Sequence, residues 1–525
     1  MLLNRVALAP LLLAAATATA TPAFAPMVQQ VVAQEDLPGI AVAVVADGEV
    51  VYRHAQGARG DGGRIDEDTL FKIASNSKAM TAALLARLVQ QGRLRWDDPV
   101  RRHLPDFRMH DAWVGEQMQV RDLLIHNSGL GPGAGDLMLW PEPNDFTRQD
   151  IIAGLAHLRP VSSFRSGYAY DNLMYVVAGE VAAAAGGKPF DVLLREQVFA
   201  PLGMQRCQAG RWSLQAVGNV AQPHVRQAGR NVAVAPEGTH SPDLPSMAAG
   251  GIRCSLRDMV RWMQVLLDPQ RVPGWLDAAQ RRQLWTLHTP MPLGARQRRW
   301  DSAHVLGYGY GWRLSDMHGT WKVAHTGTLS GMYSALALLP ERKVGVVVLI
   351  NGEGDAARTA LTHALLTQYT TPQAPRSVLE LLQELHADTP PSAERSGVEQ
   401  VADTAAPVPA SAQALLHLHG RYRDPWLGEA TLCPVNGGLR FQVVRSPRLG
   451  AQVMRDGERW RLHWDTLERS AQAYLLPHDG PPPTLQLRAV HPDIDFSYDF
   501  QDLQFTRTGA CPVPDAADGG GPPSA

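Results

Sequence analysis

The chain has 525 residues and a formal net charge of −2, with 45% hydrophobic and 19% charged residues. This composition is typical of a folded globular protein, and the length predicts more than one domain. A nearly neutral chain gives no electrostatic basis for binding nucleic acid or an anionic membrane surface, so we exclude both classes of partner.

Residues 1–25 have the pattern of an export signal. Arg5 supplies a positive charge, an apolar run extends over residues 6–20, and Ala23-Phe24-Ala25 is a cleavage site of the small-residue type. The run is too short to span a membrane, and no later segment is long and apolar enough to do so. We therefore expect a periplasmic or secreted protein without a membrane span.

Four cysteines lie beyond this segment, two in each of the two large domains predicted below. An oxidising compartment permits disulfides between Cys207 and Cys254 and between Cys433 and Cys511, and the alternative is four free buried thiols. No Cys-x-x-Cys or His-Glu-x-x-His pattern occurs, so we expect no metal and no other cofactor.

In chain order, the first predicted elements are strands at Ile40–Ala46 and Val50–Arg53, joined by the hairpin signal Asp47-Gly48. Residues 93–250 read as helical fragments broken by glycine- and proline-containing loops. A β-rich stretch follows, with strands predicted at Tyr308–Leu314, Thr320–Thr326, Ser334–Leu339 and Val344–Ile350, and a helix at Ala356–Tyr369. These elements predict one sheet built from both chain ends, a second helical lobe, and a cleft between them.

The C-terminal part begins after a change in composition. Residues 386–413 are rich in Pro, Ala, Ser, Thr and acidic residues, which is typical of a linker. Short β-type segments then recur at Glu429–Cys433, Leu439–Val444, Arg459–Trp464, Ala473–Leu476, Leu485–Val490 and Phe496–Phe505. This spacing predicts a small antiparallel barrel or sandwich, followed by a disordered tail.

One short motif points to nucleophilic chemistry. Ser75 ends an apolar lead-in and begins a long Ala/Leu-rich helical pattern, and Lys78 follows on the same helix face. The lysine amine can take the serine proton, and the helix dipole favours the negative charge that develops there. Ser-x-x-Lys also arises by chance and serine is a common helix cap, but the chain has only five lysines and this pattern only once.

Two further motifs follow in order, Tyr170-Asp171-Asn172 and His325-Thr326-Gly327. On their own, Tyr170 could be a packed aromatic residue and Asn172 a helix cap. Together with Ser75 and Lys78, the motifs resemble the penicillin-recognising serine hydrolases, in particular the class C β-lactamase-like branch of esterases, D-aminopeptidases and DD-peptidases. Residues 123–130 and 248–252 also resemble stretches of this family.

The resemblance implies an α/β (α+β) fold, with a β-lactamase/transpeptidase-like antiparallel sheet flanked by helices and a helical lobe. The segment Asp495–Leu503 resembles the β-barrel domain appended to an archaeal serine peptidase of this kind, in which that domain drives oligomerisation. We therefore predict a signal peptide at residues 1–25, a hydrolase domain at 26–372, and a helix with a Pro/Ala-rich linker at 373–413. A C-terminal antiparallel β-barrel at 414–511 and a disordered tail at 512–525 follow.

The family resemblance also implies roles for individual residues. Ser75 would attack a carbonyl and form an acyl-enzyme, and Lys78 and Tyr170 would carry the proton. Tyrosine can act as a base only where a neighbouring cation favours its phenolate, and Lys78 is the expected cation. Asn172 would hold Lys78 and a substrate amide.

Four residues at the end of the strand predicted at Thr320–Thr326 complete the implied substrate site, namely His325, Thr326, Gly327 and Thr328. Backbone N–H groups of Ser75 and Thr328 would form the oxyanion hole. Of the remaining family-like residues, we expect His126 to hold a loop, and Gly250 and Gly251 to allow close backbone approach beside the cleft.

His325 departs from the family pattern, in which lysine is usual. An imidazole is mostly neutral at pH 7, so it cannot replace a permanent cation that recognises a substrate carboxylate. We therefore expect an amide or ester substrate, cleaved by peptidase, esterase or weak β-lactamase activity. The alternative is a penicillin-sensing module that becomes acylated and does not turn over. The expected partners are a small molecule or short peptide and a second copy of the chain.

Overall fold

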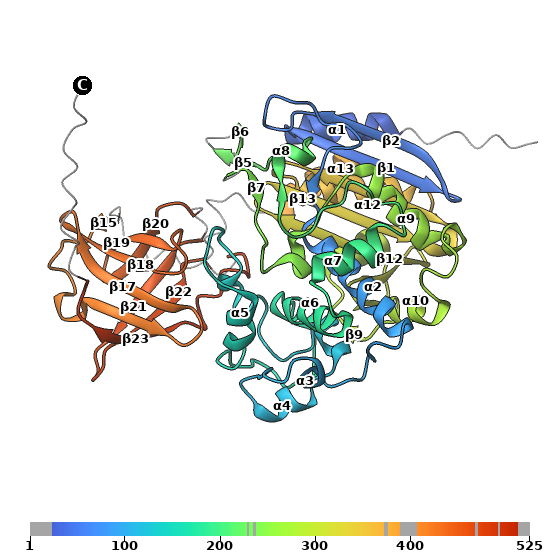
Figure 1. Ribbon diagram of the computed structural model, residues 1–525. Helices are drawn as coiled ribbons and strands as arrows, with labels where there is room; N and C mark the ends of the chain where they lie inside the picture. The colour runs from blue at the N-terminus through green and yellow to red at the C-terminus, as the bar shows by residue number, and fades with distance from the viewer. Residues whose placement is uncertain are drawn as a thin grey trace, which may run out of the picture.

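Two large β-sheets, one in each of the two domains, organise the structure (Figure 1). The computed structural model describes residues 24–227, 230–234, 238–371, 376–388, 407–467, 471–491 and 494–512. The first sheet has eight strands in the order β2-β1-β14-β13-β12-β11-β10-β9, and the second closes on itself in the C-terminal domain.

The first sheet joins the two ends of the hydrolase domain. Strands β1 (Gly39–Ala46) and β2 (Glu49–Gly57) form the expected hairpin, in which Asp47 has φ 50° and Gly48 has φ 83°. Strand β1 also pairs antiparallel with β14 (Val344–Ile350), which lies more than 290 residues further along the chain. The prediction of one sheet built from both chain ends is confirmed.

Both faces of this sheet are buried, because alternate residues of each central strand point to opposite sides. Even-numbered residues of β1, such as Val42 and Val44, pack on one face with Phe24, and odd-numbered residues such as Ala43 and Val45 pack on the other. The first face is covered by α1 (Phe24–Glu35), α12 (Asp355–Thr367) and α13 (Val378–Asp388). The second is covered by α2 (Ser77–Gln90) and α9 (Leu256–Leu267).

The prediction of one continuous strand at Tyr308–Leu314 is wrong. It divides into β10 (Leu306–Tyr308) and β11 (Arg313–Met317), with a turn between them. Gly311 has φ 78° in this turn, and a Cβ atom there would lie 2.7 Å from the carbonyl oxygen of Lys78. Glycine is therefore required where the turn presses against the start of α2. The other strands of the sheet are β9 (Thr289–Pro290), β12 (Thr320–Leu329) and β13 (Met332–Leu339).

The expected helical lobe lies between these strands in sequence. Its helices are α3 (Val100–His103), α4 (Ala112–Gln117), α5 (Arg148–Gly154), α6 (Leu173–Gly186), α7 (Phe190–Leu194), α8 (Leu214–Val217) and α10 (Ala278–Leu284). Helix α11 (Ala295–Asp301) instead packs through Trp300 with α13 on the first face of the sheet. Short strand pairs interrupt the lobe, formed by β3 (Phe71–Lys72) with β8 (Arg253–Cys254), β4 (Trp212–Ser213) with β7 (His240–Ser241), and β5 (His224–Gln227) with β6 (Arg230–Ala233). Sequence patterns did not predict these pairs, because strands of two to four residues are too short to show a periodic pattern.

The C-terminal domain is an antiparallel barrel of eight strands, closed by pairing of β19 with β20. The strands are β16 (Gly420–Asp424), β17 (Gly428–Val435), β18 (Gly438–Val443), β19 (Gly450–Asp456), β20 (Arg459–Trp464), β21 (Ala473–His478), β22 (Thr484–Ala489) and β23 (Gln504–Gly509), and β15 (Val408–Pro409) adds to one edge. The predicted barrel is confirmed, but the strand expected at Phe496–Phe505 begins only at Gln504. Residues 494–503 instead form a loop that leaves the barrel.

The barrel packs beside α5 of the first domain (Figure 1). Arg445 of the barrel lies 2.6 Å from Asp150 of α5 and donates to the carbonyl oxygen of Asp145. The hydrogen bond from the Arg445 guanidinium holds the pKa of the Asp150 carboxyl well below its usual range, although burial acts in the other direction. This ion pair links the two domains on one side, and the 494–503 loop links them on another.

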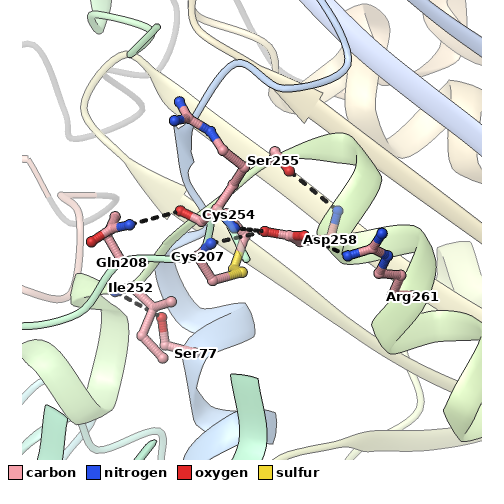
Figure 2. The surroundings of a disulfide bond; sticks show 9 residues. Ser77, Cys207, Gln208, Ile252, Cys254, Ser255, Asp258 and Arg261 are labelled. Carbon is pink, nitrogen blue, oxygen red and sulfur yellow. Dashed lines mark hydrogen bonds and ion pairs between the residues drawn. A yellow bond between two sulfur atoms is a disulfide. The ribbon is translucent and has the colours of Figure 1, made fainter. Parts of the chain in front are cut away.

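Both disulfides expected from the cysteine distribution are present, and the alternative of free thiols is wrong. Cys207 pairs with Cys254, and Cys433 pairs with Cys511. Figure 2 shows the first bridge beside Asp258 at the start of α9, whose carboxylate accepts from the backbone N–H of Cys207. Cys254 lies on β8, so the bridge fixes the strand that pairs with the lead-in to Ser75.

Several predicted segments fall outside the described residues, including 1–23 of the signal, 389–406 of the linker and 513–525 of the tail. Residues 24 and 25 of the expected signal begin α1, where Phe24 is buried against the rings of Tyr52 and Tyr369. Within the part of the chain that the structure describes, no helix has the length and apolar character needed to cross a membrane.

Candidate active site

Ser75 lies on a short 3₁₀ turn (η1, Ala74–Asn76) that connects β3 to α2. The turn begins one residue before the serine, and α2 begins two residues after it, so the predicted helix start is slightly early. Strand β3 is held by pairing with β8, and the Ile252 N–H donates to the hydroxyl of Ser77 at the first residue of α2 (Figure 2). Ser75 itself is only partly buried.

The Lys78 amine lies 3.1 Å from Ser75 Oγ, as the Ser-x-x-Lys spacing predicts. Its other partners are the side-chain oxygen of Asn172 at 2.7 Å and the carbonyl oxygen of Ala249 at 2.8 Å. Lys78 is fully buried, and this burial lowers its pKa from 10.5 to about 7. A substantial fraction of the amine is therefore neutral at neutral pH and able to accept a proton.

Tyr170 is hydrogen-bonded to Ser75, and its ring centroid lies 4.9 Å from the Lys78 amine. Burial raises the pKa of Tyr170 to about 12, although the charge of Arg313 and the hydrogen bond to Ser75 act in the other direction. The neighbouring cations therefore do not make a phenolate the resting state. Tyr170 is a phenol near neutral pH, suited to donating or relaying a proton.

Asn172 immediately precedes α6, but its side chain does not cap that helix. The cap is Asp171, whose carboxylate accepts from the backbone N–H of Leu173 at 2.9 Å. The Asn172 side chain points instead to Lys78, and its amide nitrogen donates to Asp136 at 2.8 Å. One amide hydrogen is thus committed to the protein and one remains for another acceptor.

His126 and His325 both contact Tyr308. His126 packs against the Tyr170 ring at 4.3 Å and accepts from the backbone N–H of Asp171, which agrees with the expected loop-holding role. His325 contacts the Tyr308 hydroxyl at 2.8 Å and the Thr326 carbonyl at 2.7 Å. Burial is the main cause that lowers the pKa of both imidazoles well below the usual value. The positive charges of Lys78 and Arg313 lower both pKa values further. Both rings are therefore neutral.

Arg313, which the sequence reasoning did not identify, supplies a permanent cation beside the site. It lies on β11 and donates to the Thr326 hydroxyl at 2.9 Å. Its guanidinium carbon lies 5.8 Å from the Tyr170 ring centroid. The only sequence signal was an arginine in a strand otherwise rich in aromatic and apolar residues, and the pairing of β11 with β12 decides where it goes.

The strand β12 passes directly beside the turn that carries Ser75. A Cβ atom at Gly327 would lie 2.2 Å from the carbonyl oxygen of Ile73, so only glycine allows this approach. Thr328, the next residue, is exposed, and its hydroxyl accepts from Arg358 at 2.8 Å. The close approach brings Gly327 of β12 against the residue that precedes the Ser75 turn. An oxyanion hole between the backbone N–H groups of Ser75 and Thr328 stays a prediction.

The expected role of Gly250 and Gly251 finds weaker support. A Cβ atom at Gly250 would lie 3.6 Å from Ala74, which is an ordinary contact. Their segment, a π-helical turn over Met247–Gly251, instead serves the site through the Ala249 carbonyl that accepts from Lys78. Across the described residues, no cluster of His, Cys, Asp or Glu could hold a metal ion.

Comparisons with known proteins agree with this fold. The sequence profile of the family described as Beta-lactamase matches residues 24–369. Esterase EstB from Burkholderia gladioli is 32% identical over 346 residues, which cover 59% of this chain and 84% of that protein. The unguisins hydrolase ungD' of Aspergillus campestris is 26% identical over 356 residues, covering 65% of this chain and 64% of that protein, so this chain matches just under two thirds of that relative.

A solved structure shares both domains. The octameric penicillin-binding protein homologue from Pyrococcus abyssi superimposes with a TM-score of 0.58 and 19% identity, over 92% of this chain and 99% of that chain. At this identity the similarity concerns the fold, which includes the large antiparallel sheet and the C-terminal barrel. Because the family profile covers most of the chain, this protein belongs to the β-lactamase family of serine hydrolases.

Proposed function

We propose that this protein is an exported serine hydrolase that cleaves an amide or ester through an acyl-enzyme on Ser75. The observation that carries the proposal is the 3.1 Å contact between Ser75 Oγ and the Lys78 amine, whose pKa burial lowers to about 7. A buried amine that is partly neutral at neutral pH has the proton affinity required of a general base.

The chemistry proceeds in two halves. Lys78 takes the Ser75 proton as Oγ attacks the carbonyl carbon, and the oxyanion is stabilised by backbone N–H groups of Ser75 and Thr328. Collapse breaks the bond to the leaving group, which receives a proton relayed from Lys78 through the Tyr170 hydroxyl. In the second half a water molecule gives a proton to the same pair and attacks the acyl carbon. The bond to Ser75 Oγ then breaks, the pair returns that proton to Oγ, and the acid is released.

Arg313 changes the expectation about the substrate. The neutral, buried His325 gives no charge for a substrate carboxylate, but the guanidinium of Arg313 lies on the adjacent strand and reaches Thr326. An anionic group near Thr326 would therefore find a cation. The names of relatives, an esterase and an unguisins hydrolase, support ester or amide cleavage as the reaction class.

The test combines active-site labelling with turnover. A fluorophosphonate should label wild-type Ser75, and a chromogenic ester should be hydrolysed repeatedly. Ser75→Ala should abolish labelling and lower turnover at least about 10³-fold. Ser77→Ala is the matched control, because that hydroxyl contacts only the Ile252 N–H in the described part of the site, and it should retain activity. Labelling in the Ser75→Ala variant would refute the proposal.

The competing function, a penicillin sensor, predicts a different time course. Stopped-flow hydrolysis would then give one burst of product equal to the enzyme concentration and no further turnover. Continued turnover on the ester supports the hydrolase. The alternative keeps some support from the structure of the penicillin-binding protein homologue, which has the same two domains.

Export and assembly belong to the same proposal. Two disulfides join all four cysteines, and such bonds persist in oxidising compartments, which supports a periplasmic or secreted location. The similar structure from Pyrococcus abyssi is described as octameric, which supports self-association of this chain. We propose the C-terminal barrel as the surface of contact. Size-exclusion chromatography with light scattering tests the second point directly.

A further inference from the structure

The loop 494–503 of the C-terminal domain reaches into the candidate active site. Its Asp499 carboxylate accepts from the backbone N–H of Gly135 at 2.7 Å, in the loop that precedes the short helix η3 (Asp136–Met138). A Cβ atom at Gly133 would lie 2.2 Å from the carbonyl oxygen of Phe496. The two backbones are thus in direct contact, and glycine is required at this point of the hydrolase domain.

Ser497 of the same loop begins an unbroken chain of hydrogen bonds to the nucleophile. Its hydroxyl donates to Asp136 Oδ2 at 3.0 Å, and the Asn172 amide donates to the same oxygen at 2.8 Å. Asn172 in turn holds the Lys78 amine at 2.7 Å, and the amine lies 3.1 Å from Ser75 Oγ. Four hydrogen bonds therefore connect the C-terminal domain to the reacting oxygen.

The Asp136 carboxyl group is the junction in this chain of hydrogen bonds. The residue is fully buried, and its second carboxylate oxygen has no hydrogen-bond partner among the described residues. A buried carboxyl group with two donors on one oxygen depends strongly on each of them, because desolvation leaves no water to replace a lost donor. Removing the Ser497 hydroxyl would leave Asn172 as its only donor.

We propose that Ser497 is a positioning residue for the hydrolytic reaction, which acts through Asp136 and Asn172 to hold the Lys78 amine against Ser75. The inference rests on the proposed acyl-enzyme function. It means that the C-terminal domain is part of the active site in the same chain, and not only a surface for assembly. Without the Ser497 hydroxyl, Asp136 is free to rotate, Asn172 loses its fixed orientation, and Lys78 spends less time within reach of Ser75.

The first experiment measures kcat and KM for a chromogenic ester. Ser497→Ala should lower kcat about tenfold, the effect of losing one hydrogen bond to a buried carboxyl group, and should change KM less than about twofold. Ser497→Thr retains the hydroxyl and should restore kcat to near the wild-type value. Ser411→Ala, an exposed serine of the barrel domain, is the matched control and should have no effect. An unchanged kcat, or failure of threonine to rescue it, would overturn the proposal.

A second experiment tests the route. In an Asp136→Asn background the link is already altered, so Ser497→Ala should lower kcat by less than about twofold. An equal, independent tenfold loss in both backgrounds would assign Ser497 to domain docking and contradict the proposal. Thermal unfolding of each variant shows whether the fold is retained. Fluorophosphonate labelling of wild-type Ser75 separates the acyl-enzyme proposal from the role of Ser497, because absence of labelling refutes the proposed function itself.

Discussion

Tyr170 and Phe496 pack edge to face, with ring centroids 5.6 Å apart and ring planes at 74°, although they belong to different domains. Phe496 remains 43% exposed, so part of its side chain stays accessible although its ring packs against Tyr170. The C-terminal loop therefore places an apolar ring against Tyr170, and we expect this ring to contact the acyl or leaving group of the substrate.

Phe496→Ala should change substrate preference more than catalysis. Apolar contact contributes about 0.8 kcal/mol for each buried methylene, so hydrolysis of a butyrate ester should fall about threefold to tenfold in kcat/KM. The corresponding acetate ester, which is too short for the contact, should change less than about twofold. Phe496→Leu, which keeps an apolar side chain, should lie close to wild type. Equal losses for both esters would contradict a role for Phe496 in substrate binding.

Arg313→Gln should move the acid limb of the pH–rate profile to higher pH. The positive charge of Arg313 contributes to holding down the pKa of Lys78, which burial lowers to about 7. Removing that charge raises the pKa of the lysine, and a base that must be neutral then becomes active only at higher pH. We expect a shift of about half a pH unit or more in kcat/KM.

Two controls sharpen this measurement. Arg313→Lys keeps the charge and should keep the wild-type limb, and Arg342→Gln removes an exposed arginine far along the sheet and should leave the profile unchanged. If Arg313→Gln gave the wild-type profile with only a lower plateau, Arg313 would act through substrate binding alone.

The loop that enters the site should be sensitive to alkaline pH. Burial, followed by the neighbouring Asp502 carboxyl, raises the pKa of Asp499 to about 8, and burial also raises the pKa of Asp502. The folded protein therefore retains a proton that the unfolded chain releases near pH 4, so this pair contributes stability that is lost as pH rises from about 4 to about 8.

Asp502→Asn should reduce this dependence, because an amide can donate to an ionised Asp499 without a shared proton. The melting temperature of the wild type should fall by at least about 3 °C more than that of Asp502→Asn between pH 5 and pH 9. Differential scanning calorimetry measures both. Parallel curves for the two proteins would show that the pair does not control stability in this range.

The disulfide between Cys207 and Cys254 should support the scaffold of the nucleophile. It closes a sequence separation of 47 residues and anchors β8 beside β3, the strand that leads to Ser75. Replacing both cysteines by serine should lower the free energy of unfolding by about 2–4 kcal/mol. Reducing agent should destabilise the wild type more than this variant, since the variant retains only the Cys433–Cys511 bridge. Equal effects of the reductant on both proteins would count against this role.

Local patterns in the sequence were sufficient for several features of the site. The contact between Ser75 and Lys78 follows from a three-residue spacing on one helix face, which is fixed by helical geometry. The hairpin at Asp47-Gly48 follows from the turn preference of that dipeptide. The placement of Tyr170 and Asn172 near the serine came from family resemblance, because no local rule connects segments about one hundred residues apart.

Only the tertiary structure decided that three further residues reach the site, namely Arg313, Asp136 and Ser497. Arg313 reaches the site because a glycine turn splits the expected strand and sets the register of β11 against β12. Ser497 reaches Asp136 because the segment predicted as a strand is instead a loop held by contacts with the hydrolase domain. A sequence determines the local spacing of side chains directly, whereas contacts between distant segments depend on the packing of whole domains, and no single stretch of residues carries that information.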